Sequence, residues 1–170
     1  MLERALLIFA LAALAPAAAA AGGEFSYMTL NGIRAVALDI QGIDPSFARY
    51  GLTPQGLVAA VETQLRQGGL EIISHDAARA RPHAALVQIK FRTNQSEYQF
   101  FFYNLALEVR QKIPLGNAAG GFISALIWSD ARQGSVQPTD LPRVTTWTAD
   151  LVAGFLADYH AQNAVAPKRH

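Results

Sequence analysis

The sequence predicts an α+β fold: a mostly antiparallel sheet of about five to six strands with two helices packed on one face. Apolar and polar residues alternate over 84–94 and 101–109, as in half-buried strands. Apolar residues recur at three- and four-residue spacing over 54–67 and again towards the end of the chain, as in amphipathic helices. Strands joined by short turns pair as hairpins, and two helices can cover only one sheet face.

A first hairpin is expected around Asn31-Gly32, which lies between YMTL and IRAVALDIQGI. Asn-Gly between strand-like residues is a strong hairpin signal because both turn positions need a positive φ. Pairing Leu30 with Ile33 would give one apolar core face, made of Phe25, Tyr27, Val36, Leu38 and Ile40.

The first helix is expected from about residue 54 to 67. Thr53 is suited to the N-cap, Pro54 fits the first turn, and Gly68-Gly69 ends the apolar spacing. LEIIS then predicts a short strand, HDAARARPH a polar loop, and AALVQIKFRTN a long strand.

The second hairpin contains four consecutive aromatic residues, 100–103. Odd-numbered residues are apolar in both of its strands, so a common core face requires odd residues to pair with odd residues. We therefore centre the turn on Gln95. On the other face this register places three pairs, namely Arg92 opposite Tyr98, Lys90 opposite Phe100, and Gln88 opposite Phe102.

GFISALIWSD predicts a fifth long strand, and ARQGSVQPTD a polar loop. Asp140 is expected to cap a last helix that ends near Asn163. Its apolar stripe is Val144, Trp147, Leu151, Phe155 and Tyr159. We find no internal repeat or linker, so we predict a single α+β domain over 22–163 and a disordered tail over 164–170.

Residues 1–21 have the three parts of a secretory signal peptide: a short charged start ending at Arg4, an apolar run, and small residues before the expected cleavage point. The apolar run is shorter than the roughly 20 residues that cross a bilayer. A periplasmic or secreted protein without a transmembrane segment is predicted. The chain has no cysteine, which excludes disulfides, thiolate metal sites, a cysteine nucleophile and a lipid-modified amino-terminal cysteine.

The stretch YGLTPQGLVAAVETQLRQGGLEIIS, followed by HAALVQIKFRT, resembles a layout found in small secreted bacterial envelope proteins. In these, a helix ending in Leu and Gly leads to a short strand and then to a strand opening with Ala-x-Leu-Val. The order of elements over about 33–163 is similar to the amino-terminal domain of TolB and to the penicillin-binding-protein activator LpoB. The resemblance implies a non-catalytic part of an envelope assembly.

Several function classes find no support in the residues. A net charge of +1, from 14 basic and 13 acidic residues, provides no electrostatic footprint for nucleic acid. GxSxG is absent, and GNAAGGF lacks the Lys-Ser/Thr of a phosphate loop. His75, Asp76 and His83 match no zinc-ligand spacing, so no metal or cofactor is predicted and a metal-dependent hydrolase is only the third hypothesis.

The leading hypothesis is a non-enzymatic binding or assembly module that recognises another envelope component through an aromatic, basic-rimmed sheet face. The residues predicted to bind this partner are Tyr98, Phe100, Phe102, Gln88, Lys90 and Arg92. One alternative is an ordinary solvent face with its rings covered by Lys and Arg stems. The other is a carrier that holds a lipid or other apolar ligand between sheet and helices, lined by Phe101, Tyr103, Leu105 and residues of the last helix. Homodimerisation by strand addition also stays open.

Overall fold

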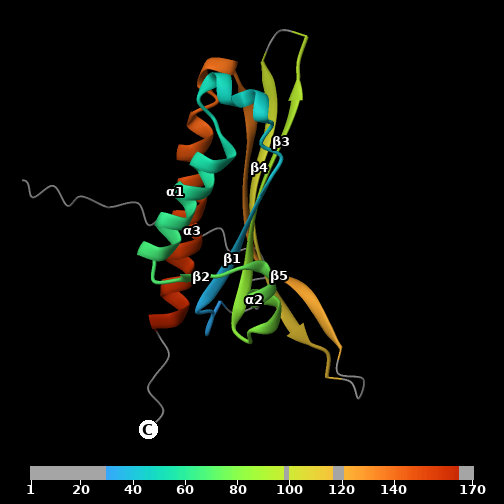
Figure 1. The fold of residues 1–170 in the computed structure, drawn as a ribbon, viewed down its shortest axis with the longest axis vertical. Helices are drawn as coiled ribbons and strands as arrows, with labels where there is room; N and C mark the ends of the chain where they lie inside the picture. Colours follow the sequence, from blue (N-terminus) through green and yellow to red (C-terminus); the bar gives the residue numbers. More distant parts are fainter. Residues whose placement is uncertain (1–29, 98–99, 117–120, 165–170) are drawn as a thin grey trace, which may run out of the picture.

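The computed structural model describes residues 30–97, 100–116 and 121–164, and in them a single sheet lies beside a helical layer (Figure 1). The elements in chain order are β1 (Ala35–Gln41), η1 (Pro45–Tyr50), α1 (Pro54–Gln67), β2 (Glu71–Ile72), α2 (His75–Ala80), β3 (Ala84–Gln95), β4 (Phe101–Pro114), β5 (Phe122–Val136), η2 (Pro138–Asp140) and α3 (Arg143–Ala164). The predicted α+β class is confirmed.

The sheet is mixed, which corrects the expectation of a mostly antiparallel one. Its strand order is β2-β1-β3-β4-β5, and β1 runs parallel to both of its neighbours, whereas β3, β4 and β5 are antiparallel. The turn at Asn31-Gly32 is present, with Gly32 at φ 81°. However, the strand expected to precede it lies outside the described residues apart from Leu30. The chain instead reaches β2 by way of α1 and reaches β3 by way of α2. A helical crossover of this kind lets the next strand run parallel to β1.

Helices cover both faces of the sheet. Helices α1 and α3 lie together on one face, where Gln64 Nε2 donates to the Ala149 carbonyl at 2.9 Å. Helix α2 lies on the other face, because Lys112 of that face donates from Nζ to the Arg79 carbonyl of α2 at 3.3 Å. Right-handed crossovers that run in opposite directions across β1 put their helices on opposite faces.

The segment 75–83 was predicted to be a polar loop, and the structure corrects this. Ser74 acts as an N-cap, with its Oγ accepting from Ala77 N at 3.2 Å, and α2 follows it. The expectation of two helices on one face holds for α1 and α3 alone. The predicted bounds of α1 are confirmed, including the Thr53 cap, whose Oγ1 accepts from Gly56 N.

The core lies between the sheet and the α1/α3 layer. Its largest fully buried side chains include Phe91, Leu105 and Leu107 from the sheet and Leu57 and Phe155 from the helices. The last helix begins at Arg143, since Asp140 belongs to the 3-10 turn η2 before it. The end of α3 is tied to the start of β1 by Tyr159, whose hydroxyl donates to the Ile33 carbonyl at 3.0 Å.

β5 is longer than predicted. Residues 131–136 continue the strand instead of forming the predicted polar loop, because β4 extends alongside them as far as the Phe101–Val136 pair. β5 is also the outer strand of the sheet, beyond β4.

Candidate functional site

The predicted partner-binding residues lie on the sheet face away from α1 and α3, but in a different register. Phe101 and Tyr103 are buried and Phe102 is 56% exposed, as the predicted alternation of faces requires. The pair Gln95–Phe101 shows that the turn is centred three residues later than predicted. A register shift by an even number of residues keeps each side chain on the same face of the sheet. The apolar pattern therefore predicted which face each side chain occupies, but it did not predict which residues of β3 and β4 lie opposite each other.

The shift in register separates the predicted patch into two parts. Phe102 lies opposite Asn94, and its ring contacts that of Phe100 edge to face at 5.0 Å between centroids. Lys90, by contrast, lies opposite Ala106, four residues and roughly 13 Å further along the strand. Arg92 lies between the two, opposite Asn104. Tyr98 lies outside the described residues.

Gln88 and Lys90 belong to a polar network at the centre of this face. Lys90 Nζ lies 2.7 Å from Glu108 Oε2, and Arg110 Nη1 lies 3.1 Å from the same oxygen. Gln88 Nε2 donates to Asp39 Oδ2 at 3.0 Å. The hydrogen bond from Lys90 holds the pKa of the Glu108 carboxyl below its ordinary value, against the opposing effect of partial burial. Of the two cations predicted to form a basic rim, Lys90 is therefore engaged within the sheet, whereas Arg92 is exposed.

The residues predicted to line an apolar-ligand site are packed against other protein side chains. The Phe101 ring meets Phe47 at 5.4 Å, and the Tyr103 ring stacks on Trp147 at 4.8 Å. Leu105 is fully buried in the same core. Core packing thus accounts for these residues, while the carrier function stays a prediction without a supporting observation.

The polar side chains of the 75–83 segment are spread over separate contacts. His75 Nε2 lies 3.0 Å from the Leu38 carbonyl oxygen, and Asp76 pairs loosely with Arg79 at 3.9 Å. No group of three or more metal-ligating side chains occurs in the described part of the chain. His83 instead lines a separate cavity at the end of the sheet.

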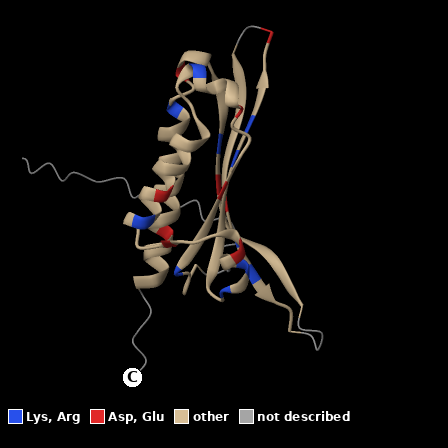
Figure 2. Ribbon diagram, in the orientation of Figure 1, with Lys and Arg blue, Asp and Glu red and all other residues tan. Residues whose placement is uncertain are grey.

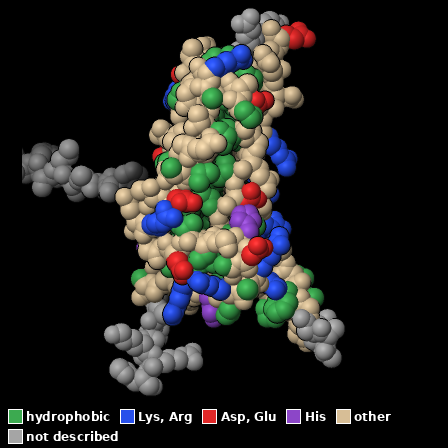
Figure 3. Space-filling model, in the orientation of Figure 1, with side chains coloured by type: hydrophobic (Ala, Val, Ile, Leu, Met, Phe, Trp, Pro, Cys, Tyr) green, Lys and Arg blue, Asp and Glu red, His purple; other side chains and the backbone are tan. Residues whose placement is uncertain are grey.

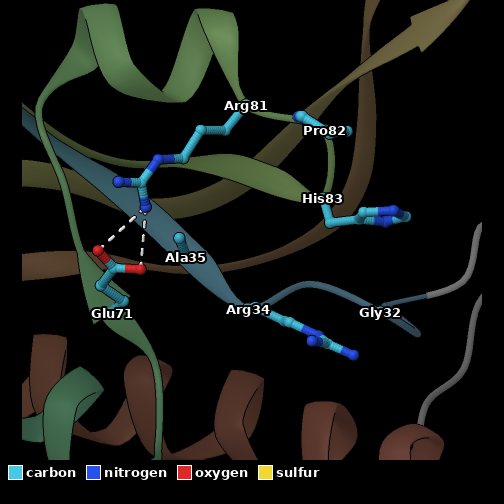
Figure 4. Close-up of a pocket in the computed structure, with 7 residues that line it drawn as sticks. All are labelled: Gly32, Arg34, Ala35, Glu71, Arg81, Pro82 and His83. Atoms are coloured by element: carbon cyan, nitrogen blue, oxygen red, sulfur yellow. Dashed lines mark hydrogen bonds and ion pairs between the residues drawn. The ribbon is translucent and has the colours of Figure 1, made fainter.

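A cavity of about 420 Å³ opens at the end of the sheet where β1 and β3 begin (Figure 4). Its lining includes Arg34, Arg81, Glu71 and the imidazole of His83. Arg81 Nη1 donates to both carboxylate oxygens of Glu71 at 3.0 Å, so this pair is internally satisfied. Arg34 points away from it and forms no ion pair with a described residue.

A second cavity, of about 310 Å³, lies beside the opposite end of the sheet. Phe100 and Trp147 contribute aromatic surface, and Asp140, Arg143 and Gln137 contribute polar groups. In this cavity Phe100 lies near the start of α3, whereas the predicted hairpin register placed it opposite Lys90.

Sequence reasoning missed the exposed apolar residues at the β4–β5 hairpin. Leu115, Phe122, Ile123 and Leu126 are 39%, 55%, 47% and 44% exposed, and we call these four residues the hairpin tip. Figure 3 shows hydrophobic side chains gathered there. The signal was present in the nearly unbroken apolar run 122–128, which an alternating strand with one wet face does not need.

Comparison with known proteins shows distant structural likeness only. No protein-family model matches the chain, and no curated protein matches it, so the resemblance to TolB and LpoB is not confirmed.

Two crystal forms of a PelC dodecamer from Paraburkholderia phytofirmans, one of them carrying a single leucine-to-methionine substitution, match at 14% and 13% identity with TM-scores of 0.41 and 0.43. Each covers 78% of this chain, and 89% or 90% of the PelC chain. A minor lipoprotein from Acinetobacter baumannii matches at 11% identity and TM-score 0.29, over 76% of this chain and 91% of its own. Likeness of this degree carries no argument about function.

No helix in the described ranges is both long and apolar enough to cross a membrane.

Proposed function

We propose that this chain is a non-enzymatic binding module of the bacterial envelope that recognises an extended segment of another envelope protein by strand addition. The envelope location rests on the signal-peptide pattern of residues 1–21. The mode of recognition rests on a single observation: the outer edge of β5, 15 residues long, has no partner strand among the described residues.

The two edges of the sheet differ in how they are protected. On one side the edge strand β2 has only two residues, and short edge strands are a common protection against unwanted pairing. On the other side β5 contains neither Lys nor Pro, and Asp130 and Arg132 are its only charged residues. Its one protective irregularity is the register shift opposite Val109 and Arg110. Such an edge is suited to receive another strand.

The structure indicates which amides face outwards. The Ala131 N–H donates to the side-chain carboxylate of the preceding residue, Asp130, at 2.7 Å, so this amide is directed away from β4. Because amides alternate in direction along a strand, the Gln133 N–H faces the same open edge. An added strand would therefore use the Gln133 N–H for a ladder hydrogen bond, and it would use the Ala131 N–H by displacing the Asp130 carboxylate.

The chain has no native cysteine, so Ser135→Cys introduces a single attachment point for a photo-crosslinker. The crosslinking is done in cells that express the full chain. Gln133→Pro removes the outward N–H, whereas the matched control Gln133→Thr keeps it and suits a strand. We expect a discrete crosslinked protein adduct in the parent and in Gln133→Thr, and its loss in Gln133→Pro with an unchanged melting temperature.

Absence of any adduct at Ser135, or an adduct unaffected by Gln133→Pro, would refute strand addition at β5. An adduct with the mass of two copies of this chain would replace the envelope partner by a second copy. If Gln133→Pro lowers the melting temperature, Ala131→Pro probes the same edge independently.

A further inference from the structure

The β4–β5 hairpin extends beyond the rest of the sheet. β3 begins at Ala84, level with Lys112, and β1 begins at Ala35, level with Ala84. β4 continues past this level to Pro114, and β5 starts opposite it at Phe122. Figure 1 shows the two strands leaving the body of the molecule at this end, away from α1 and α3.

The extending part of the hairpin is apolar on both of its faces. Phe122 pairs with Pro114 and shares a face with Lys112. Leu126 lies on the same face but opposite Arg110, where the hairpin leaves the body of the sheet. Ile123 pairs with Ile113 on the opposite face. A hairpin that extends into water would normally be polar on at least one side. This hairpin is therefore suited to an environment that is apolar on both sides.

Cationic side chains flank the hairpin tip. Lys112 Nζ lies 4.0 Å above the centroid of the Phe122 ring, and Arg110 Nε lies 3.5 Å from Ser124 Oγ. Arg34 and Arg79 belong to the same end of the sheet, and Figure 2 shows Lys and Arg along this end. Within the described ranges no carboxylate pairs with Arg34 or Lys112, which leaves both cations available to an anion.

From this geometry we infer that the hairpin tip inserts into the interfacial region of a bilayer that contains anionic phospholipid. Phe122 and Ile123 enter among the upper acyl chains, which surround a hairpin on both faces, whereas a protein surface would cover only one face. Lys112 and Arg34 remain at the level of the phosphates, and Leu126, opposite Arg110, lies no deeper than they do. The insertion is shallow, as for interfacial amphipathic segments, and crosses nothing.

The experiment measures flotation of the signal-free chain with vesicles of phosphatidylcholine alone or mixed with phosphatidylglycerol. We expect binding only to the mixed vesicles, weakened by salt. Phe122→Ser should reduce the partition coefficient about tenfold, because that ring then leaves the apolar layer. The matched control is Phe102→Ser, which removes an equally exposed ring, 56% against 55%, from the opposite end of β4 and should leave binding unchanged.

A second readout reports insertion directly. A single cysteine at Ile123, labelled with an environment-sensitive dye, should shift its emission to the blue with mixed vesicles, while the same label at Phe102 should not. Replacing Lys112 by Gln should weaken binding about fivefold. No binding to anionic vesicles, equal losses from Phe122→Ser and Phe102→Ser, or a dye at Ile123 that stays in water would each overturn the inference. The result is independent of the strand-addition test, because β5 positions 131–135 take no part in it.

Discussion

Phe101 and Phe102 are adjacent in the sequence, but truncation should cost the fold far more stability at Phe101 than at Phe102. Phe101 is 8% exposed and packs its ring against Phe47, whereas Phe102 is 56% exposed and its ring contacts Phe100. Because strand side chains alternate between faces, one ring belongs to the core and the other to the open face. The pair therefore tests the assignment of faces with two substitutions of the same chemistry.

The expected magnitudes follow from burial. Phe101→Ala removes a buried ring and leaves a cavity beside Phe47, which lowers the free energy of unfolding by about 3–4 kcal/mol. Phe102→Ala removes a ring that is already half in water, which lowers it by about 1 kcal/mol. The difference between the two variants should be at least about 2 kcal/mol, large against the total stability of a small domain.

Urea denaturation of the signal-free chain, followed by Trp fluorescence and far-UV circular dichroism, measures both values under one set of conditions. The denaturant dependence of the free energy should be the same in both variants, so that the shift in midpoint reports stability. Equal losses, or a larger loss from Phe102→Ala, would refute the face assignment, since a one-residue slip of β4 exchanges the two rings.

Two further predictions concern the backbone and the polar network. Gly42→Ala should lower the free energy of unfolding by more than about 3 kcal/mol, and Gly69→Ala by only about 1 kcal/mol. Both glycines have a positive φ. A Cβ at Gly42 would lie 1.9 Å from the Phe91 carbonyl oxygen, whereas one at Gly69 would meet nothing within 4 Å. Equal losses in thermal melts would contradict this. The Glu108 carboxyl has a lowered pKa in the folded chain, so its contribution is present above its unfolded pKa, near 4.5, and is lost as the pH falls through the lower folded value. Glu108→Gln should therefore cost about 1 kcal/mol at neutral pH and flatten the acid side of the stability profile, and an unchanged acid slope would contradict the role of the network.

Local signals in the sequence predicted much of the fold. The Thr53 cap, Pro54 and Gly68 define α1 through contacts within a few residues, and these were read correctly. The parallel placement of β1 depends on β2 and β3, which are distant in the sequence. An Asn-Gly turn specifies local geometry and not the neighbouring strand. Helix α2 was missed because six residues with one Ser cap leave too short a pattern for helical spacing.

The candidate surfaces were predicted less well for a related reason. Alternation assigned Phe102 and Lys90 to the correct face, but it could not fix which residue lies opposite which. The hairpin tip and the open edge of β5 depend on where neighbouring strands end, a property of the whole sheet. Residues 122–128 contained the clue, yet an apolar run suits a buried central strand as well as an extending hairpin.

Hydrogen bonds between residues 30–32 and the end of α3 also bear on when folding is completed. Leu30 N donates to Gln162 Oε1 at 2.6 Å, Gly32 N donates to Asn163 Oδ1 at 3.0 Å, and Asn163 Nδ2 donates back to the Leu30 carbonyl. β1 also needs β3 beside it, about fifty residues later in the chain. While the chain emerges from the ribosome, the segment that leads into the first strand therefore lacks these contacts until Gln162 and Asn163 have been made. This part of the fold therefore closes late, a delay that would suit the export route predicted from residues 1–21.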